Sequence, residues 1–188
     1  MNDTAHDTST SVLYDRIASR FGELLDHCPA DRWSSASPCP GWTARDVAAH
    51  VVRNHRRALA GLDGSTYAAP TVDEDIHQAW RDCAHDVRGA LRDPDQAATP
   101  LGAQFGSITF AEFVRRMACA DTLIHTWDFA RATAQDETLD AGGVDVATAM
   151  LMPEDEQIRL PGAFGGKVET AADADAQTRL LNFLGRTV

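Results

Sequence analysis

Apolar residues recur at helical spacing in four segments of the chain, and three of these segments open at a polar residue suited to cap a helix. Ser9 or Thr10 can cap the first helix, and the second and fourth open on Thr-x-x-acid sequences that have the form of a capping box. We therefore expect four helices, over residues 10–28, 43–60, about 72–91, and 109 to about 132–134.

The pattern changes after Asp140. A short helix is expected over residues 144–152, a glycine-rich loop follows, and a last helix begins at Asp173 and ends at Gly185. No strand-like alternation intervenes between the helices. The sequence thus predicts an all-α fold: a disordered lead-in (1–8), a four-helix bundle (9–140) and a small C-terminal appendage packed on it (141–188).

Polar residues interrupt the core-facing stripe of the fourth predicted helix. Its apolar members are Phe110, Phe113, Val114, Met117 and Ile124. Continued at the same spacing, the stripe takes in Asp121, His125 and Asp128. An unpaired buried carboxylate is very unfavourable, so Asp121 needs a partner, and His125 is its neighbour at i+4 on the same face. Such a pair pointing into a bundle core is a common way to hold a metal ion.

The second predicted helix supplies a third candidate. His50 and Asn54 lie on its inward stripe, whereas Arg45, Arg53, Arg56 and Arg57 are expected to fall away from it. If the two helices are neighbours, His50, Asp121 and His125 form a set of two histidines and one carboxylate. Three protein ligands leave positions open for water or substrate, as in catalytic sites. The alternative is a buried hydrogen-bond network that binds no metal.

Several neighbours of this set have two interpretations. Asp128 could orient His125 or form a surface ion pair with Arg131. Trp42 could wall a pocket or pack in the core. Cys39, in a loop before Pro40, is expected to be buried rather than nucleophilic.

Composition excludes some functions. The formal net charge is −11, which argues against nucleic acid and anionic membranes as partners. We find no apolar run long enough to span a membrane and no signal peptide. The four cysteines show no CxxC spacing, so they are expected to be reduced in a cytoplasmic protein.

Three segments carry a resemblance to a known family. SPCPGWTARDVAAHVV and ADTLIHTWDFARA resemble the DinB/YfiT-like superfamily, in particular the actinobacterial branch that includes the mycothiol-dependent maleylpyruvate isomerase N-terminal domain. The ending DADAQTRLLNFLGR is similar to the tail of small metal-binding proteins of that branch. The resemblance covers about residues 9–187.

The resemblance implies a bundle that holds a divalent metal through His50, Asp121 and His125, with Asp121 where the isomerase pattern has Glu. Zinc is the first choice, and nickel or iron would also suit such donors. It further implies a thiol-dependent transferase or isomerase, in which the metal activates mycothiol toward an electrophilic substrate, and a homodimer. The alternative is a non-catalytic metal-binding bundle that acts as a sensor, a store or a partner-binding module.

Overall fold

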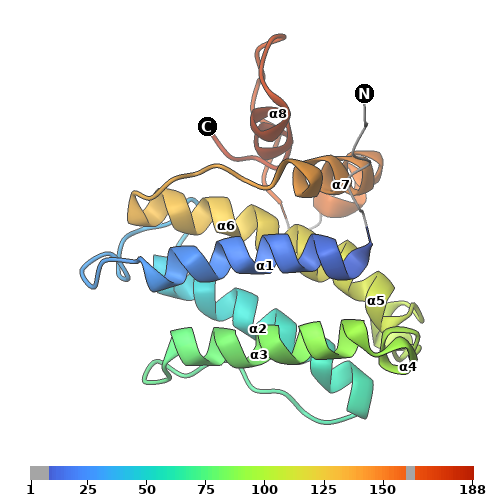
Figure 1. The fold of residues 1–188 in the computed structure, drawn as a ribbon. Helices are drawn as coiled ribbons and strands as arrows, with labels where there is room; N and C mark the ends of the chain where they lie inside the picture. The colour runs from blue at the N-terminus through green and yellow to red at the C-terminus, as the bar shows by residue number, and fades with distance from the viewer. Residues whose placement is uncertain (1–8, 160–163) are drawn as a thin grey trace, which may run out of the picture.

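The computed structural model describes residues 9–159 and 164–188, and these residues form an all-α structure (Figure 1). The predicted disordered lead-in at 1–8 and the start of the predicted glycine-rich loop, at 160–163, lie outside the described residues. The helices are α1 Thr10–Asp26, α2 Ala44–Asp63, α3 Ile76–Arg92, α4 Pro94–Ala97, α5 Phe110–Phe113, a π-helical turn Val114–Ala118, α6 Cys119–Thr133, α7 Ala141–Leu151 and α8 Ala176–Phe183. Short 3₁₀ turns occupy Ala103–Phe105, Met152–Glu154 and Gln157–Arg159.

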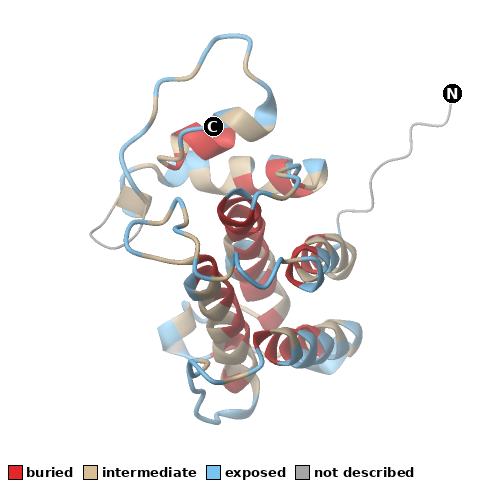
Figure 2. Ribbon diagram, turned by 90° about the vertical axis from the view of Figure 1, so that its left-hand side faces the viewer, coloured by how far each residue is buried: buried red, intermediate tan, exposed pale blue. Residues whose placement is uncertain are grey.

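Four long helical segments make the bundle, and the prediction of an all-α bundle is confirmed. α1 packs against α3 and α6, and α2 packs against the same two helices. Their buried faces turn toward one another, as Figure 2 shows. The largest side chains of this core are fully buried: Trp127, Tyr14, Phe21, Phe110 and Phe129. None of the helices within 9–159 and 164–188 is long and apolar enough to cross a bilayer.

α6 is the central helix of the fold. Every residue from Thr122 to Ala130 is buried, because α1, α2 and α7 all pack on it. A polar side chain in this part of the helix therefore needs a hydrogen-bond partner inside the protein, whichever way it points.

Local capping sets where the helices begin. The Ser9 side chain caps α1, and Thr43 with Asp46 and Thr109 with Glu112 both form complete capping boxes, as predicted. The third helix begins later in the chain than the predicted start at about residue 72. It begins at Ile76 because Asp75 accepts hydrogen bonds from the next backbone amides, and Val72 is 83% exposed.

The fourth predicted helix is continuous but irregular. Between α5 and α6 the backbone forms a π-helical turn, in which the amide of Cys119 bonds to the carbonyl of Val114, five residues back. The extra residue in this turn shifts the side chains around the helix. Met117, predicted on the inward stripe, is 55% exposed, so that prediction was wrong, while the other four members of the stripe are buried.

The C-terminal segments lie over one side of the bundle, next to α1 and α6 (Figure 1). α7 contacts α6 and α1, and α8 contacts α7. α7 begins earlier than predicted, because Asp140 caps it, and α8 begins at Ala176 behind its cap Asp175. Leu180, Leu181 and Leu184 are fully buried, so this region is packed through an apolar face.

Candidate metal centre

The packing of α2 on α6 brings the three predicted ligands together. His50 lies two turns after the N-cap of α2, and Asp121 and His125 lie one turn apart at the start of α6. His50 Nε2 is 3.0 Å from Asp121 Oδ1, and His125 Nε2 is 3.7 Å from the same oxygen. One donor atom of each residue lies within 4.8 Å of the others.

Asp121 is a carboxylate held in its charged form. Burial alone would raise its pKa. The charge of His125 and hydrogen bonds from His50 and Asn54 outweigh burial and lower the pKa of Asp121 to about 2. Asn54 Nδ2 donates to the second oxygen, Oδ2, at 3.1 Å. Asp121 therefore offers an ionised oxygen to any cation placed between the two histidines.

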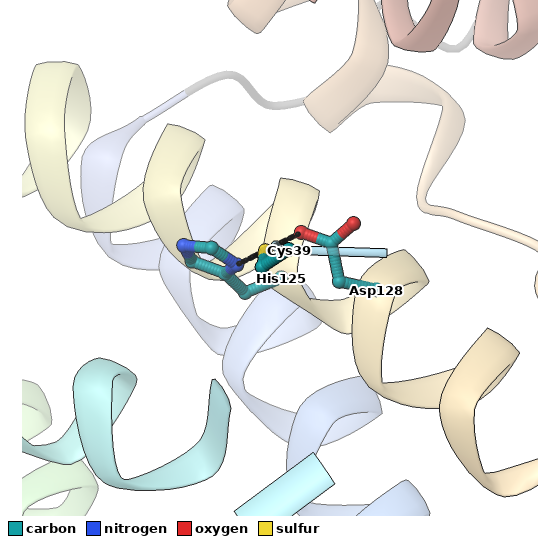
Figure 3. A group of neighbouring side chains, drawn as sticks. All are labelled: Cys39, His125 and Asp128. Carbon is teal, nitrogen blue, oxygen red and sulfur yellow. Dashed lines mark hydrogen bonds and ion pairs between the residues drawn. The ribbon is translucent and has the colours of Figure 1, made fainter. Parts of the chain in front are cut away.

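His125 is oriented from behind by Asp128. The Nδ1–H of His125 donates to Asp128 Oδ2 at 2.9 Å, and Asp128 is fully buried (Figure 3). Burial would lower the pKa of His125, but the Asp121 charge and the bond to Asp128 raise it to about 10. Of the two interpretations of Asp128, the structure shows the contact with His125, since Arg131 instead pairs with Glu137 at 2.6 Å.

Two further residues, Cys39 and Arg186, contact Asp128 on the Nδ1 side of His125. Cys39 Sγ donates to Asp128 Oδ2 at 3.3 Å and lies beside the His125 ring (Figure 3). Arg186 donates a hydrogen bond to each oxygen of Asp128, from Nε to Oδ1 at 3.2 Å and from Nη2 to Oδ2 at 2.8 Å. Sequence patterns missed Arg186, and the one available signal was an arginine two residues after the apolar run of the last helix.

Cys39, His125 and Asp128 also have donor atoms within 4.8 Å of one another. A cation at this second position would meet the guanidinium of Arg186, which already neutralises Asp128. The electrostatics therefore favour the set His50, Asp121 and His125.

Arg53 lies against the site, contrary to the prediction that it falls away from this face. Its Nη2 donates to His50 Nδ1 at 2.6 Å. A guanidinium is only a donor, so Nδ1 of a neutral His50 must accept, and the ring proton then lies on Nε2, facing Asp121. Ligation through Nε2 requires the proton to leave this atom and Arg53 to release Nδ1.

A cleft of about 330 Å³ opens beside His50. Trp42, His50 and Arg53 line it, together with Gly41, Asp46, Ala49 and Ala69. The Trp42 ring lies 5.0 Å from the His50 ring and stacks at 5.9 Å on His125. Trp42 therefore fits both interpretations, since it packs against the core and also walls the cleft, and a small molecule in the cleft would meet His50.

The fold and the cluster together define an all-α bundle with a candidate His–carboxylate metal site at its edge. The chain belongs to the family of the mycothiol maleylpyruvate isomerase N-terminal domain, whose model matches residues 14–130. Two uncharacterised proteins of Mycobacterium tuberculosis, from strains CDC 1551 and H37Rv, are each 28% identical to it, over 94% of this chain and 97% of their own length. No solved structure matches the chain significantly.

Proposed function

We propose that His50, Asp121 and His125 hold a divalent metal, and that the protein is a thiol-dependent transferase or isomerase of the mycothiol type. One observation carries the proposal: two imidazoles and an ionised carboxylate from α2 and α6 converge beside an open cleft. Membership of the mycothiol-related family supports the choice of thiol. We place the protein in the cytoplasm, where its four free cysteines stay reduced.

The donor set fits such an ion. Ligands 2.0–2.1 Å from a tetrahedral zinc are about 3.4 Å apart. The separations of Asp121 Oδ1 from the two histidine nitrogens, 3.0 and 3.7 Å, lie on either side of this value. Zinc remains our first choice, and nickel and iron are accepted by the same donors.

A bound divalent metal supplies a positive charge that lowers the pKa of a low-molecular-weight thiol. The chain's own residues prepare the site for it. Asp128 keeps Nδ1 of His125 occupied, so that Nε2 faces Asp121, and Trp42 gives the cleft an apolar wall. Arg53 places a cation in the cleft, suited to an anionic group of a thiol or substrate. Cys39 lies on the Nδ1 side of His125, away from Nε2, so the reacting thiol would come from outside the chain.

The alternative is a metal-binding bundle without chemistry, which would work as a sensor, a store or a partner-binding module. The cleft favours the enzyme, because a structural metal site is normally closed by four protein ligands. A homodimer remains a prediction.

Elemental analysis tests the metal. The protein would be purified without a metal-affinity column, beside His50→Ala and His125→Ala, with His85→Ala as control because His85 is exposed on α3. About one metal per chain, lost in the first two variants only, supports the site. Metal-dependent binding of mycothiol, measured by calorimetry, then separates the transferase from the non-catalytic module. No metal in any sample would leave the hydrogen-bond network as the explanation of the cluster.

A further inference from the structure

The end of the chain reaches the metal centre. Arg186 follows α8, and its side chain is only 11% exposed. It contacts Asp128, on α6, with two nitrogens, one for each carboxylate oxygen. Such a two-pronged ion pair fixes the plane of the carboxylate as well as its position.

The backbone around Arg186 is held in place. Gly185 has φ +85°, a conformation that favours glycine, and a Cβ there would stand 3.0 Å from the backbone of Gly165 and Gly166. The guanidinium also donates to the Leu184 carbonyl at 3.1 Å and lies over the Phe164 ring. The last turn of the chain therefore points Arg186 inward.

Asp128 joins Arg186 to the predicted ligand His125. The oxygen Oδ2 accepts from Arg186 Nη2 at 2.8 Å and from His125 Nδ1 at 2.9 Å. Because Asp128 is fully buried, no water can replace either partner without a rearrangement of the core. Removing Arg186 would free the carboxylate to rotate away from the imidazole.

We propose that Arg186 is a positioning residue of the metal centre: through Asp128 it fixes the ring of His125 with Nε2 toward His50 and Asp121. The inference rests on the proposed metal site. It also gives a function to the C-terminal part of the chain, because Arg186 lies outside the residues 14–130 that the family model matches.

Zinc affinity of the full-length protein, measured by competition with a chromogenic chelator, tests this role. Loss of such outer partners typically weakens metal binding by about 10–100-fold. We expect a weakening of this order in Arg186→Ala. The effect should be smaller in Arg186→Lys, which keeps the positive charge but cannot form the bidentate contact with Asp128. Arg179→Ala is the matched control, since Arg179 is exposed on α8 and its side chain donates to the backbone carbonyl of Ala174, away from Asp128.

A double-mutant cycle with Asp128→Asn separates this role from a general loss of stability. If Arg186 acts through Asp128, adding Arg186→Ala to Asp128→Asn changes the zinc Kd little further. In the metal-free protein, the proton on His125 Nδ1 should give a downfield NMR resonance that is lost or exchanges faster in Arg186→Lys. This readout also serves if Arg186→Ala does not fold.

The outcomes are distinct. Zinc affinity within twofold of wild type in Arg186→Ala or, if that variant does not fold, in Arg186→Lys, or effects of Arg186→Ala and Asp128→Asn that simply add, would overturn the positioning role while leaving the metal site intact. Wild-type protein that binds no zinc, with an unchanged His125 resonance in Arg186→Lys, would overturn both.

Discussion

At the scale of single residues, the contact between Arg53 and His50 opposes metal binding, in addition to the proton that the raised pKa of His125 keeps on its ring. Arg53 donates to Nδ1, which keeps the ring proton on the Nε2 atom that a metal would need. We expect Arg53→Gln to tighten zinc binding by about 3–10-fold, equivalent to about 1 kcal/mol for one hydrogen bond no longer broken on ligation. Chelator competition would measure the change.

Arg57→Gln is the control for the loss of a positive charge from α2, because Arg57 lies over the Phe105 ring instead of His50. If Arg53→Gln weakened zinc binding, or if both variants shifted affinity equally, Arg53 would not be a competitor for His50. Its role would then lie in binding an anionic group in the cleft.

His55 makes the stability of the fold depend on pH. It is fully buried, its Nδ1 bonds to the Val51 carbonyl, and its Nε2 has no partner within the described residues. Burial lowers the pKa of His55 to about 4, below its ordinary value of 6.5. Below pH 6.5 His55 binds a proton in the unfolded chain but stays neutral in the folded protein. Acidification toward pH 4 therefore destabilises the fold.

From these values, His55 should remove about 2 kcal/mol from the free energy of unfolding between pH 7 and pH 5. Urea unfolding at the two pH values measures the difference. His55→Gln cannot take up the proton, so its loss of stability over this interval should be smaller by that amount, whatever its absolute stability. An equal loss in both proteins would show that other groups cause the pH dependence.

At the scale of elements, local signals predicted the helices where caps and apolar spacing agree. Thr43 with Asp46 and Thr109 with Glu112 fixed two helix starts, because a capping box is a contact between near neighbours. The π-helical turn was missed, since hydrophobic spacing assumes 3.6 residues per turn throughout, and Met117 was misplaced for this reason.

The same distinction holds for the site. His50, Asp121 and His125 could be predicted because each is a polar residue on an apolar stripe. Arg186 could not, because it meets Asp128 across 58 residues and belongs to no periodic pattern. Arg53 was assigned to the outer face by its position on the helix, but its long side chain reaches back to the ring of His50.

The π-helical turn ends three residues before Asp121, and it accommodates one residue more than a regular helix would. Deleting Met117, which is exposed, should convert the turn to α-helix and keep Asp121 and His125 facing α2. We expect the deletion protein to fold cooperatively and to keep its zinc stoichiometry, as measured by thermal unfolding and elemental analysis.

Deletion of Arg81, exposed in the regular helix α3, is the matched comparison. There the loss of one residue turns the rest of the helix by about 100°, so its buried residues face solvent. We expect a much larger drop in Tm than for the Met117 deletion. Equal damage in both would mean that the π turn has no spare residue to lose.

At the scale of the whole molecule, the candidate centre joins parts of the chain that the bundle alone does not hold together. His50 comes from α2, Asp121, His125 and Asp128 from α6, and Arg186 from the segment after α8. A metal bound at this point would be tied to folding of both the bundle and the C-terminal region, because the unfolded chain has no preformed site.

Zinc should therefore raise the unfolding temperature of the full chain. Free ligand at 100 times its Kd stabilises the native state by about 2.7 kcal/mol. For a chain of 188 residues this corresponds to about 5–11 °C in Tm. Differential scanning fluorimetry with zinc, and with EDTA to reverse the effect, would measure the shift. His125→Ala should lose it and His85→Ala should keep it, whereas a rise of equal size in all three proteins would indicate zinc binding to surface groups and not to the centre between α2 and α6.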